Sequence, residues 1–293
     1  MTESSQDRSV IVGIDGSAGS AVALQWAIDH ADHLGSVTPV ITFVSGPFEY
    51  GFGTTRGITD GGEPYRSEAT LRLRTFLDEH APSLADAGKV IEHRAGPGLV
   101  EAADGAELLI VGTRGWGSRV DMSVGSVGAY CARHATVPVA LIPAEVPPIH
   151  DHLDVVVGFD GSPHAVSALR WTLAHLRRSA RVTAVRVVSS GAVIGDPLVP
   201  SPEEAAATAR EELEQGVAAV LGELQGHPAV ELTVTSGDPR AALRAASSDA
   251  DLLVVGSRGH GVLDRLLLGS VATALVHHPT IPTIVVPHLD HQV

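Results

Sequence analysis

Two glycine-rich segments carry the residues of this chain that are best suited to chemistry. The first begins at Gly112 and the second at Gly256, and each reads Gly-x-x-Gly, nine further residues and then Gly-Ser. Each follows an apolar run that is typical of a buried strand. A glycine loop leading from a strand into a helix presents backbone amides to an anion, and the helix dipole favours negative charge there. The sequence therefore predicts two phosphate-binding loops, 144 residues apart.

The predicted binding residues of these loops are glycines, an arginine and a serine. The glycines permit a close approach of the backbone, and the arginine matches the oxygens of a phosphate in pairs. The Gly-Ser step supplies amides and a hydroxyl at the start of a helix. These residues are Gly112, Arg114, Gly115, Gly125 and Ser126 in the first loop, and Gly256, Arg258, Gly259, Gly269 and Ser270 in the second.

An aspartate follows the first apolar run of each half. Asp15 stands in the segment IDGS and Asp160 in the matching segment FDGS. In a doubly wound sheet the first and fourth strands are neighbours, so both motifs open on one crevice at the carboxyl ends of the strands. A carboxylate there repels a phosphate. It accepts a hydrogen bond from an adenine amino group or a ribose hydroxyl, holds a metal ion, or only orders the turn.

The similarity between the halves extends over most of the chain. Val10–Ala27 matches Val155–Thr172, and Val137–Pro143 matches Ile281–Pro287. A period this long indicates domain duplication. Apolar strand runs that alternate with helices indicate parallel sheets covered on both faces. We therefore predict an α/β protein of two tandem, doubly wound, parallel five-stranded sheets of the Rossmann-like type. Its predicted parts are a first domain at 1–146, a linker at 147–153 and a second domain at 154–293.

Three local features bear on the shape of the crevices. Ala18–Leu34 is predicted to be one amphipathic helix. Gly96 and Gly112 are 16 positions apart, whereas Gly237 and Gly256 are 19 apart, which predicts that the third helix of the first half is nearly a turn shorter. The glycine-rich segment 45–62 is long for a loop and is interpreted as a lid, a partner contact or disorder.

Composition excludes several classes of function. The formal charge is −14 and the isoelectric point about 5.4, which disfavours binding to nucleic acids and to anionic membranes. A single cysteine, Cys131, excludes an intrachain disulfide and a cysteine-based metal site. A polar N-terminus and the lack of a stretch long enough to cross a bilayer predict a cytoplasmic protein.

Other conspicuous residues are interpreted as structural. Trp26 and Trp171 occupy matching positions and are expected to anchor the core or an interface. Cys131 is expected to be a small buried hydrophobic residue. Ser162 precedes Pro163, a pattern typical of a helix N-terminus. The lone lysine, Lys89, lies outside both loops, so neither is a Walker A motif.

The IDGS and FDGS openings and the doubled Gly-2x-Gly-9x-Gly-Ser pattern resemble the universal stress protein family in its tandem two-domain form. The motif is similar to that of the family's ATP-binding branch. The resemblance implies an adenine-nucleotide-binding fold, ATP in each crevice and dimer-like pairing of the domains through their last strands. It carries the family's nucleotide contacts onto the aspartates, glycines and serines above, and adds Val44 and Val187 at the ends of the second strands.

Several functions are compatible with these residues. The leading hypothesis is an ATP-binding stress-response protein that acts as a nucleotide-dependent sensor on an unidentified protein partner, as a homodimer or an intramolecular pseudo-dimer. A second is a slow ATPase or nucleotidyl transferase, in which Asp15 or Asp160 holds Mg²⁺ and Arg114 or Arg258 stabilises the developing charge. A third is an AMP or cyclic-nucleotide sensor, because the motif does not specify the number of phosphates. A scaffold protein whose two sites hold no ligand is a further alternative.

Overall fold

The computed structural model describes residues 8–45, 62–115, 125–146, 152–189, 201–259 and 268–289. Most of the glycine-rich segment 45–62 and most of the linker predicted at 147–153 lie outside these residues. The first half contains β1 (Ser9–Ile14), α1 (Ala18–Asp29), α2 (Ala31–Leu34), β2 (Ser36–Phe43), α3 (Glu63–His80), a short 3-10 helix (Pro82–Leu84), β3 (Lys89–Glu92), α4 (Ala95–Ala102), β4 (Leu108–Gly112), α5 (Ser126–His134) and β5 (Val139–Ile142).

The second half repeats this order of strands and helices. It contains β6 (Asp154–Gly158), α6 (Pro163–His175), β7 (Arg181–Val188), α7 (Pro202–Glu223), β8 (Ala229–Ser236), α8 (Pro239–Ala246), β9 (Leu252–Gly256), α9 (Ser270–His277) and β10 (Thr283–Val286). In each half the five strands run parallel, and the first pairs with the fourth, as predicted. The α/β class and the alternation of strands and helices are therefore confirmed.

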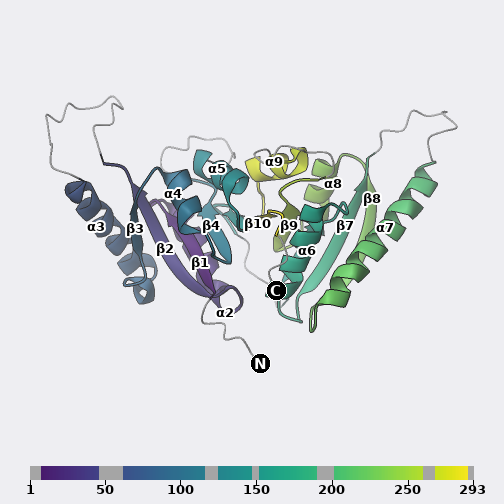
Figure 1. The fold of residues 1–293 in the computed structure, drawn as a ribbon, viewed down its shortest axis with the longest axis horizontal. Coiled ribbons are helices and arrows are strands. Elements are labelled where there is room, and N and C mark those ends of the chain that lie inside the picture. Colours follow the sequence, from purple (N-terminus) through teal and green to yellow (C-terminus); the bar gives the residue numbers. More distant parts are fainter. Residues whose placement is uncertain are drawn as a thin grey trace.

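The two five-stranded units join in one continuous sheet. The strand order is β3-β2-β1-β4-β5-β10-β9-β6-β7-β8, and β5 and β10 pair antiparallel at its centre. Figure 1 shows the two halves meeting there, with α3 and α7 at the far ends. Ala140 lies opposite Ile284 in this pair, and both are buried. The prediction of two sheets is thus refined: the last strands pair the halves within one chain.

The helices divide between the two faces of the sheet. One hydrophobic cluster contains residues of α1, α3, α6 and α7, and the other contains residues of α4, α5, α8 and α9. Successive strand residues alternate between them, so Val10 and Val12 pack on one face and Ile11 on the other. Both clusters extend across the β5–β10 pair, which makes the cores of the halves continuous. This is the doubly wound arrangement that the apolar strand runs predicted.

The helix predicted over Ala18–Leu34 is interrupted at His30. The Nδ1 atom of His30 lies 2.7 Å from the carbonyl oxygen of Trp26, and α1 ends at Asp29. This side-chain hydrogen bond occupies one of the carbonyls left without an intrahelical partner at a helix C-terminus. The short helix α2 then ends at Gly35, whose φ of 113° is accessible mainly to glycine.

The prediction of a shortened third helix in the first half is wrong. Helices α4 and α8 each have 8 residues. The error came from treating Gly96 and Gly237 as equivalent. Gly237 forms the turn before α8 with a φ of 134°, whereas Gly96 lies inside α4, where a Cβ would come within 2.7 Å of the Tyr130 ring. The two glycines meet different steric demands, so their spacing carried no information on helix length.

The halves fill one part of their core in opposite ways. Phe159, at the end of β6, packs against Gly216 of α7. The buried residues Ala209, Leu213 and Val217 of α7 correspond to Ala69, Leu73 and Leu77 of α3. By this correspondence the first half has Ile14 and Phe76 where the second has Phe159 and Gly216. The large ring therefore comes from the strand side in one half and from the helix in the other.

We expect Gly216→Ala to destabilise the protein by about 1 kcal/mol. Alanine is favoured over glycine in a helix by about 1 kcal/mol, but the new Cβ would lie 2.8 Å from the Phe159 ring. In a Phe159→Ile background, which restores the first-half residue, the same change should become stabilising. Urea unfolding of the four variants measures this cycle. A stabilising Gly216→Ala in the otherwise unchanged protein would contradict it.

Candidate functional site

The second half contains a cavity of about 590 Å³ at the carboxyl ends of its strands. This volume lies within the range of about 300–1,000 Å³ that is usual for small-molecule sites. The ends of β6, β7 and β9 and the helices α7, α8 and α9 supply its walls. All seven residues predicted for this half line it, namely Asp160, Val187, Gly256, Arg258, Gly259, Gly269 and Ser270.

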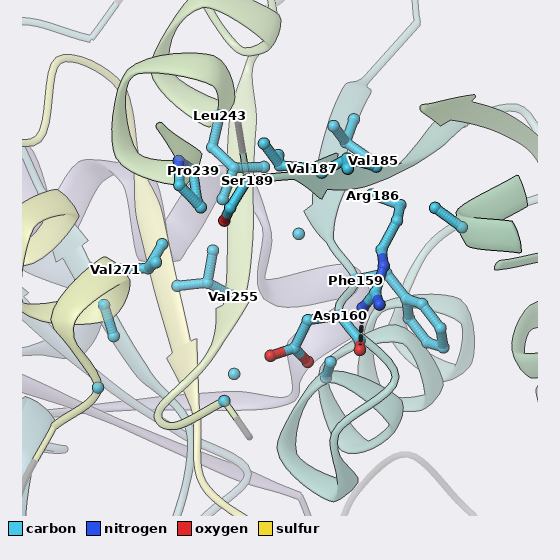
Figure 2. Close-up of a pocket in the computed structure, with 18 of the residues that line it drawn as sticks. Phe159, Asp160, Val185, Arg186, Val187, Ser189, Pro239, Leu243, Val255 and Val271 are labelled. Atoms are coloured by element: carbon cyan, nitrogen blue, oxygen red, sulfur yellow. Dashed lines mark hydrogen bonds between the residues drawn. The ribbon is translucent and has the colours of Figure 1, made fainter. Parts of the chain in front are cut away.

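The cavity combines an apolar lining with one central carboxylate. In Figure 2 the Asp160 side chain points into the cavity, with Val255 and Val271 on one side and Phe159 and Arg186 on the other. Val187 and Leu243 lie at the end away from Asp160. This mixture suits a ligand with a flat apolar part and a few polar groups.

The two carboxylate oxygens of Asp15 and of Asp160 have different surroundings. The Oδ1 atom of Asp160 accepts a hydrogen bond from the Ser162 amide at 2.9 Å, and Asp15 accepts the equivalent bond from Ser17 at 2.9 Å. The interpretation that these carboxylates order the first turn is therefore correct as far as Oδ1 is concerned. The Oδ2 atom of Asp160 lies beside the glycine loop, where a Cβ on Gly259 would come within 2.5 Å of it.

The same arrangement recurs in the first half. A Cβ on Gly115 would come within 2.5 Å of the Oδ2 atom of Asp15. The loops are also tied to the first helix of each half, because Ser17 donates to the Arg114 carbonyl at 3.1 Å and Ser162 donates to the Arg258 carbonyl at 3.3 Å. The structure thus brings the aspartate and the loop of each half together, as the strand order requires.

The leading glycine of each loop is required by the packing of a helix. A Cβ on Gly256 would lie 2.7 Å from the carbonyl carbon of His164, in the first turn of α6. A Cβ on Gly112 would lie 2.6 Å from the carbonyl oxygen of Gly19, in the first turn of α1. In both halves the loop therefore passes closer to backbone than any side chain would allow.

Helix α9 differs from the other helices around the cavity in its N-terminus. Ser162, Ser201 and Asp238 accept hydrogen bonds from the first-turn amides of α6, α7 and α8. Helix α9 begins after Gly269 with no side-chain cap, and so does α5 after Gly125. Since the first amides of a helix have no intrahelical acceptor, α9 presents them where Ser270, Val271 and Ala272 line the cavity.

The charges that line the cavity are balanced. They belong to Asp160, Glu212, Arg186 and Arg258. Arg186 donates to the backbone carbonyl of Asp160 and to Glu212 at 2.8 Å, and its side chain is only 20% exposed. The cavity lining is therefore neutral overall, although the chain as a whole carries a net charge of −14. Arg186 was not predicted as a site residue, although a charged residue inside the apolar run of β7 indicates a polar contact.

The corresponding region of the first half, at the carboxyl end of β2, has different chemistry. By the strand registers, Ile41 occupies the place of Arg186. Glu92 there accepts a hydrogen bond from Ser45 and lies 3.9 Å from Arg66. Val44, predicted to contact the ligand, is 38% exposed at this end. Residues 46–61 and 116–124, which come after β2 and β4 in the sequence, lie outside the described part of the chain.

Several other residues behave as the sequence predicted. Trp26 and Trp171 are buried in the core. Cys131 is buried, and desolvation raises the pKa of its thiol to about 12, so it is a poor nucleophile.

Burial, and then the charge of Arg258, lower the pKa of His164, which lies in the first turn of α6. Among the described residues, no three His, Cys, Asp or Glu side chains are grouped so as to hold a metal ion.

Similarity to known proteins accords with this geometry. A sequence profile of the universal stress protein family matches residues 8–143 and again residues 153–287. The chain belongs to the universal stress protein family. Both copies of the match include the aspartate and the glycine loop, so this universal stress protein has the tandem form of the family. No helix in the described ranges has the length and apolar character needed to cross a bilayer.

Relatives share this organisation over their full length. A universal stress protein of Mycobacterium tuberculosis is 29% identical over 298 residues, which cover 97% of this chain and 99% of the relative. One from Mycolicibacterium smegmatis is 27% identical over 300 residues, which cover 98% and 99%. The crystal structure of a universal stress protein from Archaeoglobus fulgidus superposes with a TM-score of 0.66 at 18% identity, covering 98% of this chain and 100% of that one. That structure supports the fold.

Proposed function

We propose that this universal stress protein binds an adenine nucleotide in the second-half cavity, with the phosphates at the start of α9. The observation that carries the proposal is the uncapped N-terminus of α9, which faces a cavity whose other helices are capped by their own side chains. Free amides and the positive end of the helix dipole attract an anion. Arg258, in the same loop, adds a full positive charge.

The rest of the cavity suits a nucleoside. From α9 the ligand would extend past Asp160 toward the end of β7, where Val185, Val187 and Leu243 form apolar walls. The carboxylate of Asp160 would accept a hydrogen bond from a ribose hydroxyl or an adenine amino group. We propose ATP as the ligand. Asp160 is the lining carboxylate nearest the loop, and it fits a Mg²⁺ ion that phosphate oxygens otherwise coordinate.

The first half retains the loop and the aspartate, so we propose a second and chemically different site there. Asp15, Gly112, Gly115 and Ser17 repeat the second-half contacts. Ile41 takes the place of Arg186 in this half, and Glu92 and Arg66 lie near the end of β2. The two sites are therefore expected to differ in affinity for one nucleotide.

For the biological role, we propose a nucleotide-dependent sensor that reports the nucleotide state of the cell to a protein partner during stress. Binding would order each glycine loop against its neighbouring helix and so change the surface beside the crevice. The alternative of slow hydrolysis or nucleotidyl transfer uses the same residues, with Asp160 at the metal and Arg258 at the developing charge.

Isothermal titration of the full chain with ATP tests the proposal. We expect saturable binding, because a preformed cavity and uncapped amides need no large rearrangement. Parallel titrations with AMP and cyclic AMP decide the number of phosphates that the loop holds. No binding of ATP, AMP or cyclic AMP at millimolar concentration would rule out the proposed site. Release of inorganic phosphate with Mg²⁺, lost in Asp160→Ala, would favour the enzymatic alternative.

A further inference from the structure

A partly buried ion pair joins two walls of the second cavity. The Nη2 atom of Arg186, on β7, lies 2.8 Å from the Oε2 atom of Glu212, on α7, and Arg186 also donates to the backbone carbonyl of Asp160 (Figure 2). The Arg186 side chain is 20% exposed, whereas that of Glu212 is 57% exposed. A guanidinium holds its N–H donors in one rigid plane, so a single side chain can bind two acceptors at once. Arg186 therefore ties together the strand, the helix and the turn that carries Asp160.

The turn that carries Asp160 begins where the strand ladder ends. Gly158 is the last residue of β6 and pairs with Val185 of β7. The Phe159 amide still donates to the Val185 carbonyl at 2.9 Å. The chain then turns away from the sheet into α6, and a side chain of β7, that of Arg186, supplies a donor to the Asp160 carbonyl. Arg186 thus extends the contact between β7 and this part of the chain beyond the end of the ladder.

Asp160 is fixed at two points. Its Oδ1 atom accepts a hydrogen bond from the Ser162 amide at 2.9 Å, and its carbonyl accepts one from Arg186. The direction of a side chain depends on the backbone torsions of its own residue, and the contact at the carbonyl restrains one of these torsions. The two hydrogen bonds together therefore hold the carboxylate in the direction that Figure 2 shows, toward the interior of the cavity.

The first half supplies a natural comparison. Asp15 keeps the hydrogen bond between its Oδ1 atom and the Ser17 amide, at 2.9 Å. By the strand registers, Ile41 stands at the position of Arg186, and it lies opposite Ile14 of β1. An isoleucine side chain has no hydrogen-bond donor. The second strand of the first half therefore cannot fix the aspartate in the way that Arg186 does.

The partner on the helix also differs between the halves. The correspondence that pairs Leu73 of α3 with Leu213 of α7 places Arg72 at the position of Glu212. Arg72 is exposed. The strand and helix positions thus carry opposite charges in the second half, whereas in the first half they carry an apolar side chain and a positive charge. Only the second half has the ion pair that orients the strand arginine.

We propose that Arg186 is a positioning residue that fixes the Asp160 carboxylate for one polar group of the nucleoside, a ribose hydroxyl or the adenine amino group. This inference rests on the proposed binding of an adenine nucleotide in the second cavity. Arg186 acts through Asp160, because its guanidinium is engaged by two acceptors of the protein itself. An acceptor that is already in place needs no ordering when the ligand binds. The second site therefore selects for that group more strongly than the first site does.

Amide hydrogen exchange of the full chain without ligand, followed by NMR, tests the positioning role. In Arg186→Ile, which copies the first-half residue, we expect the Ser162 amide to exchange about 10-fold faster, because the turn loses a hydrogen bond from a charged donor. The Ser17 amide is the internal reference and should not change. Arg210→Ala removes the exposed Arg210–Glu214 pair from α7 and should change neither amide. Unchanged exchange of Ser162 in Arg186→Ile would overturn the proposal, whether or not a nucleotide binds.

Titration calorimetry tests the effect on the ligand. A Gly115→Val background leaves the second site to be titrated alone. The ligands are ATP, 2′-deoxy-ATP, 3′-deoxy-ATP and ITP, in which a carbonyl replaces the adenine amino group. With Arg186 in place, we expect one of the three analogues to bind about 10-fold more weakly than ATP, because it loses the hydrogen bond to Asp160. In Arg186→Ile this ratio should approach one, while the ratio of the affinities for ATP and adenosine stays unchanged.

Two results of the titrations would overturn the proposal while the binding of ATP itself stands. The first is an analogue ratio that Arg186→Ile leaves unchanged, including the case in which all ligands weaken equally, as a merely structural change would cause. The second is equal affinity for ATP and the three analogues with Arg186 in place. If ATP does not bind with Arg186 in place, the proposed function fails, and the selectivity assigned to Arg186 fails with it.

Discussion

Gly259→Val is expected to weaken nucleotide binding to the second cavity by at least 10-fold while the protein stays folded. A Cβ at this position would lie 2.5 Å from the Oδ2 atom of Asp160, so the valine side chain pushes the carboxylate out of place and occupies the space in front of the loop. Charge-assisted hydrogen bonds contribute about 1.5–3 kcal/mol each, so losing one or two accounts for this factor. Gly259 is not among the glycines with positive φ, and the backbone therefore accepts valine.

The first half contains the matched control for this variant. Gly115→Val places a Cβ at the same 2.5 Å from the Oδ2 atom of Asp15. Titration calorimetry should show that Gly259→Val removes the second-cavity component and that Gly115→Val leaves it. Near-unchanged Tm values in both variants would exclude unfolding as the cause. If Gly259→Val bound ATP as tightly as the unmodified protein, the phosphates would not lie at this loop.

Ile284→Ala is expected to lower the free energy of unfolding by about 2–5 kcal/mol. Ile284 is 1% exposed in β10 and lies opposite Ala140 of β5, which is fully buried. Alanine facing alanine would leave a void at the centre of the ten-stranded sheet, where the small residue on β5 cannot fill it. Because the hydrophobic clusters run through this pair, both halves should lose stability together.

Chemical denaturation followed by circular dichroism measures this effect. Leu71→Ala is the control, because Leu71 is 66% exposed on α3 and its removal should change stability by less than about 0.5 kcal/mol. Separate transitions for the two halves in Ile284→Ala would contradict this joint loss of stability. A variant as stable as the unmodified protein would contradict the continuous core.

The sequence predicted the features that depend on local pattern. Uniformly apolar runs as short as Leu252–Val255, followed by glycine, are typical of strands buried on both faces of a parallel sheet. The strand order of a doubly wound sheet then placed Asp160 and the second glycine loop at the ends of neighbouring strands. All seven residues predicted for that half line one cavity.

Features that depend on contacts between residues far apart in the sequence were not predicted. Arg186 and Glu212 are 26 residues apart, and only the packing of α7 on β7 joins them. The break between α1 and α2 at His30 is likewise not visible in helical periodicity, because apolar residues continue at helical spacing through it. Gly96 and Gly237 appeared equivalent because a glycine that admits an aromatic ring and one with positive φ look alike in a sequence.

Photoaffinity labelling with 8-azido-ATP, followed by peptide mapping, tests the central claim most directly. The account predicts that the label attaches to peptides lining the second cavity, from β7 and α7, and that excess ATP or Gly259→Val prevents the labelling. Labelling confined to surfaces away from the glycine loops, or labelling that excess ATP does not reduce, would contradict the account.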